Sequence, residues 1–144
     1  TLSSSSAASD VYKRQDDILA GRPVGTLFLP TAERLDHRKR WIAYSLREAG
    51  VIDVDAGAAD AITVHGRSLL SPGITACNGD FEIGDAVIVR APDGRTIAKG
   101  LVNYTAADLQ RIRGKRRDEV EATLGRREYD EVIHRDHLVL MEPA

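Results

Sequence analysis

The sequence predicts a small, mainly β barrel with short helices, and three observations favour this fold class. From residue 50 onward, short runs of apolar and β-branched residues follow one another, and glycine-centred turns separate them. The chain has 144 residues, which suits about one domain. Aromatic residues make up only 5% of the chain, so valine, isoleucine, leucine and alanine must supply most of the core. Many short strands with few helices are typical of a small barrel.

Composition excludes several classes of protein. The net charge is −2, with 20 basic against 22 acidic residues, which disfavours a globally basic nucleic-acid binder and an acidic tail protein. No apolar run reaches the roughly 18 residues that a membrane span needs. The single cysteine, Cys77, excludes an internal disulfide and a multi-cysteine zinc site. We therefore expect a cytoplasmic globular protein with no membrane partner.

The first 15 residues do not read as part of a fold. They contain four consecutive serines and little that could be buried, so ordering them would cost entropy without a return. They also lack the basic start and apolar stretch of a signal peptide. Residues 1–15 are therefore predicted to be a non-native or disordered leader.

The next 30 residues contain two helix signals around one strand signal. Asp16–Ala20 predicts a short helix that ends at Gly21. Gly25–Leu29 is a short apolar strand candidate, which Pro30 ends. Glu33–Ala43 is compatible with a second helix. Residues 16–45 thus form a separate region before the barrel.

The first half of the barrel begins with Val51–Val54, which alternates like a strand. Asp55 is a good N-cap for a helix over Ala56–His65. Asp93-Gly94 lies between two β-rich runs and predicts a hairpin, because both residues tolerate positive φ. The expected strands of this half are Ser68–Leu70, Ile74–Cys77, Ala86–Arg90 and Thr96–Tyr104.

The second half contains two helix starts. Thr105–Asp108 resembles a capping box, and its helix is expected to end near Gly114. Asp118–Glu121 repeats the acidic start, and Gly125 is expected to end that second helix. The closing strands are expected at Glu131–His134 and His137–Met141.

Several segments resemble a known family when they are read in order. The region between residues 50 and 109 resembles a PUA domain through three segments: Ser68–Ile74, Gly79–Val87 and Gly94–Gly100. With its flanking segments, the chain from about residue 17 to 140 resembles the C-terminal third of glutamate 5-kinase. These flanking segments are Gly25–Phe28, Arg38–Ile42, Ala49–Gly50, Val54–Ala58 and His134–Asp136.

The resemblance implies a fold and a division of the chain. It implies a PUA-like pseudo-barrel at residues 46–144. It also implies that residues 16–45 are the C-terminal helix and strand of an amino-acid kinase domain, orphaned here, followed by a linker helix. The missing kinase domain is then the expected partner, and a homo-oligomer is left open.

The resemblance also implies a parent activity. Glutamate 5-kinase uses ATP and Mg²⁺ to phosphorylate the γ-carboxylate of glutamate, the first step of proline biosynthesis, with its catalytic groups in the upstream domain. Phosphoryl transfer needs a phosphate-cradling loop, a cation and a metal site. Neither G-x-x-x-x-G-K-[ST] nor G-x-G-x-x-G occurs in this chain. We therefore expect an accessory or regulatory fragment without catalytic, cofactor-binding or metal-binding residues of its own.

Two basic clusters suggest another function. The candidate nucleic-acid contacts are Arg111, Arg113, Lys115, Arg116 and Arg117. Acidic residues follow this cluster at once, and only Tyr104 and Tyr129 lie near it as stacking partners, which weakens the case for RNA. The first cluster comprises Arg34, Arg38, Lys39 and Arg40, and a solvated linker helix explains it better than a phosphate or RNA contact.

The remaining reactive side chains are expected to serve structure. His134 and His137 flank Asp136, but residues i and i+3 of a strand face opposite sides, which disfavours a metal site. His134 is expected to bond to the backbone instead. Cys77 reads as a small buried apolar residue. Trp41 is expected to anchor the linker helix to one of the two domains.

Three functions remain open on the sequence alone. The first is the accessory part of a glutamate 5-kinase. The second is an RNA-binding module, which would use the cluster at residues 111–117. The third is a structural element that forms oligomers.

Overall fold

The computed structural model describes residues 15–23, 37–126 and 129–142. The chain divides into two compact units, Thr1–Arg34 and Leu35–Ala144. In the first unit, residues 15–19 are helical and Gly21 has a φ of 72°, as its place after the predicted helix requires. The predicted strand Gly25–Leu29 and nearly all of the leader lie outside the described residues.

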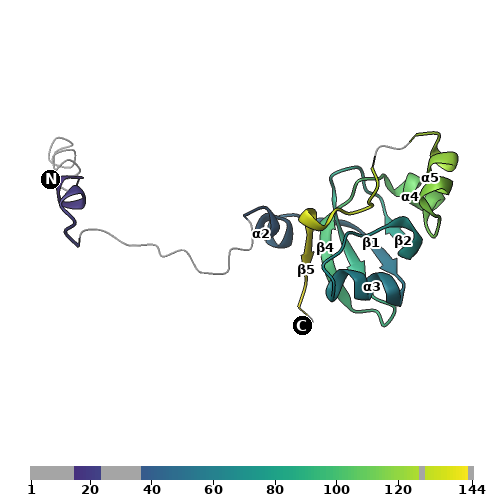
Figure 1. Ribbon diagram of the computed structural model, residues 1–144, viewed down its shortest axis with the longest axis horizontal. Coiled ribbons are helices and arrows are strands. Elements are labelled where there is room, and N and C mark those ends of the chain that lie inside the picture. The colour runs from purple at the N-terminus through teal and green to yellow at the C-terminus, as the bar shows by residue number, and fades with distance from the viewer. Residues whose placement is uncertain (1–14, 24–36, 127–128, 143–144) are drawn as a thin grey trace. The chain divides into compact units, whose positions relative to one another are not determined.

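The second unit is built on one mixed sheet of five short strands (Figure 1). The strands are β1 (Glu48–Val54), β2 (Ile74–Gly79), β3 (Ala86–Arg90), β4 (Thr96–Leu101) and β5 (Leu138–Leu140). Their order in the sheet is β2-β1-β3-β4-β5. Only the β1–β3 pair is parallel, and the other three pairs are antiparallel. A mainly β fold with short helices is therefore confirmed.

The turn between β3 and β4 is the hairpin that Asp93-Gly94 predicts. Gly94 has a φ of 86°, a conformation that favours glycine. The carboxylate of Asp93 accepts a hydrogen bond of 3.0 Å from the backbone N–H of Arg95 and so closes the turn.

The sequence prediction was wrong about two strands and about the end of a third. Ser68–Leu70 and Glu131–His134 are not strands, because only Leu69 and Ile133 pair there, in an isolated antiparallel bridge. The strand predicted over Thr96–Tyr104 ends at Leu101. The chain then turns toward the helix that follows. Local apolar runs cannot reveal how many residues find a partner strand.

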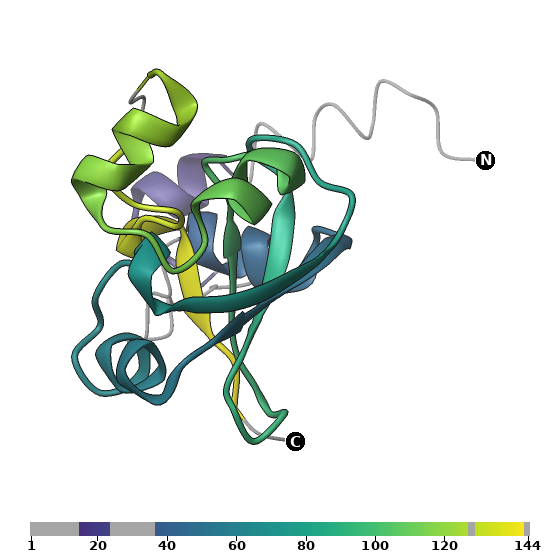
Figure 2. The same ribbon diagram turned by 90° about the vertical axis from the view of Figure 1, so that its right-hand side faces the viewer.

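The helices of this unit are all short. They are α2 (His37–Tyr44), α3 (Ala56–Thr63), α4 (Ala106–Ile112) and α5 (Arg117–Leu124), with 3₁₀ turns η1 (Ser71–Gly73) and η2 (Arg135–His137). The described part of the predicted linker helix is α2. In both views, α4 and α5 lie together at one end of the barrel and α3 at the other (Figures 1 and 2).

Local capping signals located the helix starts. Asp55 Oδ1 accepts a hydrogen bond of 2.7 Å from the backbone N–H of Ala58, and Thr105 Oγ1 accepts one of 3.2 Å from that of Asp108. The second acidic start was misplaced, because α5 begins at Arg117. There Glu119 accepts a bond of 2.8 Å from the Arg116 N–H, which is one half of a capping box.

The core lies on one face of the sheet. Strand residues such as Ile52, Val87 and Val89 are fully buried there against Leu109 and Ile112 of α4. The helix α2 contacts β4 and β5, and its Ile42 is also fully buried but lies outside that core cluster. The barrel therefore buries apolar surface at a second place, beneath α2.

Candidate functional site

The junction between α2 and the barrel is organised by a buried lysine on β4. The side chain of Lys99 is only 2% exposed. Its Nζ donates to the carbonyl oxygens of Leu46 at 2.5 Å and Ala43 at 3.4 Å, and to Glu48 Oε1 at 3.0 Å. The first two acceptors lie at and just beyond the C-terminal end of α2, where helix carbonyls lack intrahelical donors. One ammonium group thus ties the end of α2 and the start of β1 to the sheet.

The charges at this junction are complementary. A cation next to a helix C-terminus is favourable because the unpaired carbonyls carry partial negative charge. The hydrogen bond from Lys99 is the main cause that lowers the pKa of the Glu48 carboxyl below its usual value. Glu48 itself is 48% exposed, so most of the desolvation falls on Lys99. The arrangement fixes α2 on the barrel and contains no reactive group aimed at a substrate.

Sequence reasoning missed Lys99, although a signal was present. The lysine stands between Ala98 and Gly100 in a strand that is otherwise apolar, where a buried charge needs a dedicated set of acceptors. The neighbouring Gly100 did indicate a close approach, which the structure confirms. A Cβ at that position would lie 2.6 Å from Ile133 Cγ2 and 2.9 Å from the His137 carbonyl oxygen.

The predicted nucleic-acid contacts lie along the end of α4 and the start of α5, and most of them have partners within the chain. Arg111 donates to the Thr123 carbonyl at 2.9 Å, and Lys115 donates to the Thr123 hydroxyl at 2.9 Å. Arg113 donates to the Thr75 carbonyl at 3.1 Å. Arg117 pairs with Asp130 at 3.2 Å.

These bonds give the basic cluster a structural role. They join α4 and its C-terminal end to α5 and to the edge strand β2, and they join α5 to the segment that precedes η2. Arg116 is exposed, and its backbone N–H is the group that bonds to Glu119. Contact with nucleic acid through this cluster stays a prediction, and it would have to compete with these internal partners.

The two aromatic residues near this cluster form a pair. The rings of Tyr104 and Tyr129 meet edge to face, with centroids 6.2 Å apart. Tyr104 is buried and donates a hydrogen bond of 2.5 Å to the Tyr129 carbonyl. A cavity of about 270 Å³ lies beside them, with Arg117 in its lining. Tyr104 is therefore committed to the fold and does not offer its face for stacking.

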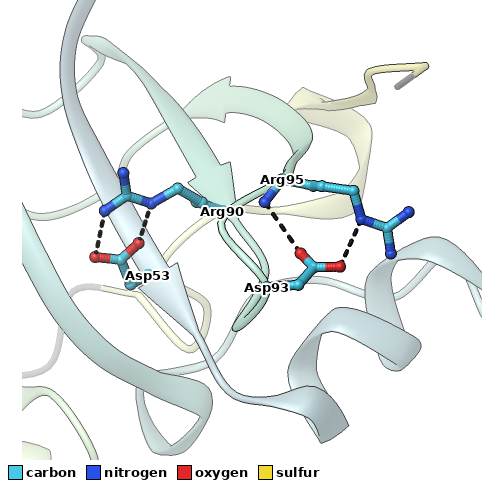
Figure 3. Close-up of polar contacts among 4 residues, drawn as sticks. All are labelled: Asp53, Arg90, Asp93 and Arg95. Carbon is cyan, nitrogen blue, oxygen red and sulfur yellow. Dashed lines mark hydrogen bonds and ion pairs between the residues drawn. The ribbon is translucent and has the colours of Figure 1, made fainter. Parts of the chain in front are cut away.

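The outer face of β1 and β3 carries one ion pair, and the hairpin between β3 and β4 carries another (Figure 3). Arg90 donates two hydrogen bonds, of 2.5 and 3.0 Å, to the carboxylate of Asp53 across the parallel strand pair β1–β3. Arg95 pairs with Asp93 at 2.5 Å in the hairpin. The hydrogen bonds that Arg90 donates to Asp53 raise the pKa of Arg90, and those that Arg95 donates to Asp93 lower the pKa of Asp93. The charges on this face are mutually compensated.

The structure also describes His134, Cys77 and Trp41, which the sequence analysis expected to serve the fold. His134 Nδ1 accepts a hydrogen bond of 3.1 Å from the Asp136 N–H, which confirms the predicted bond to the backbone. Cys77 is buried in the core, and its burial raises the pKa of the thiol. Trp41 lies on α2 and is 50% exposed.

The described residues contain neither a cluster of metal ligands nor a helix that could span a membrane. In residues 15–23, 37–126 and 129–142, no three His, Cys, Asp or Glu side chains lie together as metal ligands would. The helices in these ranges are also too short and too polar to cross a membrane.

The sequence profile of the PUA domain matches residues 50–124, and the chain belongs to this family. Two curated relatives are glutamate 5-kinases. That of Syntrophus aciditrophicus (strain SB) is 50% identical over 125 residues, 87% of this chain and 32% of its own length. That of Trichlorobacter lovleyi is 50% identical over 123 residues, 85% of this chain and 33% of its own length.

The chain thus spans about a third of the length of these relatives and resembles their C-terminal region. Among solved structures, a PUA domain from Aeropyrum pernix K1 in complex with tartrate is 23% identical. That likeness covers 60% of this chain and 41% of the other, with a TM-score of 0.45.

Proposed function

We propose that this chain acts as the C-terminal accessory region of a glutamate 5-kinase. In this proposal the parent enzyme uses ATP and Mg²⁺ to convert L-glutamate to γ-glutamyl phosphate, at the start of proline biosynthesis. The observation that carries the proposal is the 50% identity to glutamate 5-kinases over 87% of this chain. The match extends well beyond residues 50–124, which the PUA family alone accounts for.

The junction at Lys99 supports a coupling role. Ile42 and the end of α2 are held on the barrel by burial and by three hydrogen bonds from one ammonium group. The helix α2 is therefore held as part of the barrel. A domain that moves α2 must break these contacts or move the whole barrel. Such a link suits a module that tunes a neighbouring domain.

The chain on its own is expected to have no kinase activity, because the phosphate-binding motifs are absent from its sequence. The test is an assay of glutamate-dependent ADP release by the purified chain with ATP and Mg²⁺. We expect release at the level of a buffer control. Turnover that depends on both glutamate and this chain would contradict the proposal.

RNA binding makes a different prediction. If the cluster at residues 111–117 held RNA, affinity would fall linearly with salt on logarithmic axes, and R113Q/K115Q would weaken it. We expect no retardation of single-stranded RNA at about 50 mM salt, since four of the five side chains already have internal partners. Salt-dependent retardation that the double variant abolishes would favour the RNA-binding alternative.

A further inference from the structure

A second group of basic side chains lines a cavity at the β5 edge of the sheet, which is the edge opposite β2. This group is separate from the cluster at residues 111–117. The cavity measures about 240 Å³ and lies along β5, the free edge of the sheet. Lys39 comes to it from α2, Arg67 from the loop after α3, and Arg135 from η2. Ile62 and Leu138, both buried, are among its apolar lining. Three elements far apart in the sequence thus bring one cation each to the same small space.

These cations are poorly compensated. Among the residues that the structure describes, no carboxylate lines the cavity. Within the described ranges, neither Lys39 nor Arg67 makes an ion pair. The nearest carboxylate to Arg135 is Asp136 at 4.0 Å, where both side chains are about 70% exposed. Asp136 also lies 3.5 Å from His134 Nδ1.

The contrast with other arginines of the barrel is clear. Arg90 and Arg95 each hold a carboxylate at 2.5 Å. At the cavity, like charges converge without such a partner, and this raises their mutual repulsion. An anion in the cavity would relieve the repulsion.

The edge of β5 adds a backbone donor. The N–H of Met141 bonds to the carbonyl of Ile97 at 2.9 Å, and Leu140 pairs with Ala98. Because hydrogen-bonded pairs alternate along an antiparallel ladder, Leu140 directs its own N–H and C=O away from β4. Leu140 borders the cavity and is exposed, so its N–H is available at the same place as the cations.

We propose that this cavity is a binding site for a small organic anion that carries a carboxylate or phosphate group. The guanidinium groups of Arg67 and Arg135 offer planar forks that match either oxyanion, and Lys39 adds a point charge. The apolar lining accommodates a short carbon skeleton. A volume of about 240 Å³ is below the usual range for drug-sized ligands, which restricts the ligand to a small molecule.

The test is a titration of the ¹⁵N-labelled chain at constant ionic strength, read from amide chemical shifts. The probes are succinate, inorganic phosphate and, as an uncharged analogue of succinate, succinamide. We expect saturable shifts from succinate, from phosphate or from both, centred on Gly66, Arg67 and residues 135–140. Which of the two anions binds more tightly identifies the group that the site recognises. Succinamide should cause no saturable shift.

Two variants make the assignment specific. R67Q/R135Q should weaken binding about tenfold or more, because two charge-assisted hydrogen bonds are lost. R116Q, which removes an exposed cation near the start of α5, should leave the affinity unchanged. The same spectra show whether each variant is folded. Shifts that match those from succinamide, that centre on residues 111–117, or that survive R67Q/R135Q in a folded protein would overturn the proposal. This inference does not depend on the proposed kinase role.

Discussion

Lys99 shows at the residue scale how one buried charge can organise a junction between elements. Its ammonium group is out of contact with water, so its stability rests on the acceptors that surround it. One of these is the carbonyl of Ala43 in the last turn of α2, which has no intrahelical donor, and another is the carbonyl of Leu46 just beyond the helix. The third, Glu48, is half-exposed and can return to water if the lysine is lost. The carbonyls therefore account for most of the expected effect of a substitution.

Lys99→Met tests this role. Methionine keeps most of the apolar volume but removes the donor, so the carbonyls of Ala43 and Leu46 lose their bond. We expect the free energy of unfolding to fall by roughly 1–3 kcal/mol. Urea denaturation measures it, with Arg40→Met at an exposed position of α2 as the control, which should change stability by less than about 0.5 kcal/mol. Equal stability of the Lys99 variant and the wild type would refute the role assigned to the junction.

His137 gives the barrel a pH dependence. Burial is the main cause that lowers its pKa below 6.5, with contributions from Arg38 and His134, while Asp136 opposes the shift. The unfolded chain therefore binds this proton more readily, and stability is lost as pH falls below about 6.5. His137→Gln should reduce the loss of stability between about pH 7.5 and 5, whereas the exposed His65→Gln should retain it. Urea midpoints at the two pH values measure both slopes. A wild-type slope in the His137 variant would contradict the assignment.

Residues differed in how well the sequence revealed them. The close approach at Gly100 was predictable, because a glycine inside a strand implies that something lies where a Cβ would be. Lys99, its neighbour, was not, because its acceptors lie more than 50 positions away in the sequence. The convergence of Lys39, Arg67 and Arg135 was hidden for the same reason. Distant partners leave no local pattern.

At the scale of elements, a helix covers one edge of the sheet. The edge strand β2 is covered by α4, which sends Arg113 to the Thr75 carbonyl and Gln110 to the Cys77 carbonyl, at 3.1 and 2.7 Å. Exposed strand edges invite pairing with other chains, and such side chains occupy the acceptors. The helix α4 thus protects β2.

Gln110→Ala with Arg113→Ala tests this protection. Two backbone carbonyls lose their donors, so we expect a loss of about 1–2 kcal/mol in stability. The bared edge should also increase self-association relative to the wild type. Urea denaturation and sedimentation velocity read the two effects, with Arg116→Ala as a control that touches no strand. If the double variant sediments and unfolds like the control, α4 does not serve this purpose.

At this scale, the sequence predicted elements well where the interacting residues lie close together along the chain. The starts of α3 and α4 were predictable, because Asp55 and Thr105 bond to backbone only three residues away. The hairpin at Asp93-Gly94 is equally local. The prediction of strands around Leu69 and Ile133 was wrong, because these two residues form a single bridge between segments 64 positions apart. The parallel pairing of β1 with β3 also left no trace in either strand.

At the scale of the whole molecule, the resemblance to a known family predicted more of the fold than hydrophobic periodicity did. The ordered segments predicted the PUA family, and the profile match confirmed it. Periodicity alone reached only a mainly β barrel. Neither could locate the contacts that fix α2 to the barrel, which support the proposed accessory role. The division at residues 45 and 46 stays a prediction, and α2 belongs to the compact unit Leu35–Ala144.

The most direct test of the accessory role is a chimera. Residues 16–144 of this chain replace the matching part of the Syntrophus aciditrophicus glutamate 5-kinase, and glutamate-dependent ADP release is measured beside that of the unaltered enzyme. We predict a turnover number within about tenfold of the parent, because this region would supply no catalytic group and would cost less than about 1.4 kcal/mol in the barrier. A folded chimera with no glutamate-dependent turnover would contradict the account.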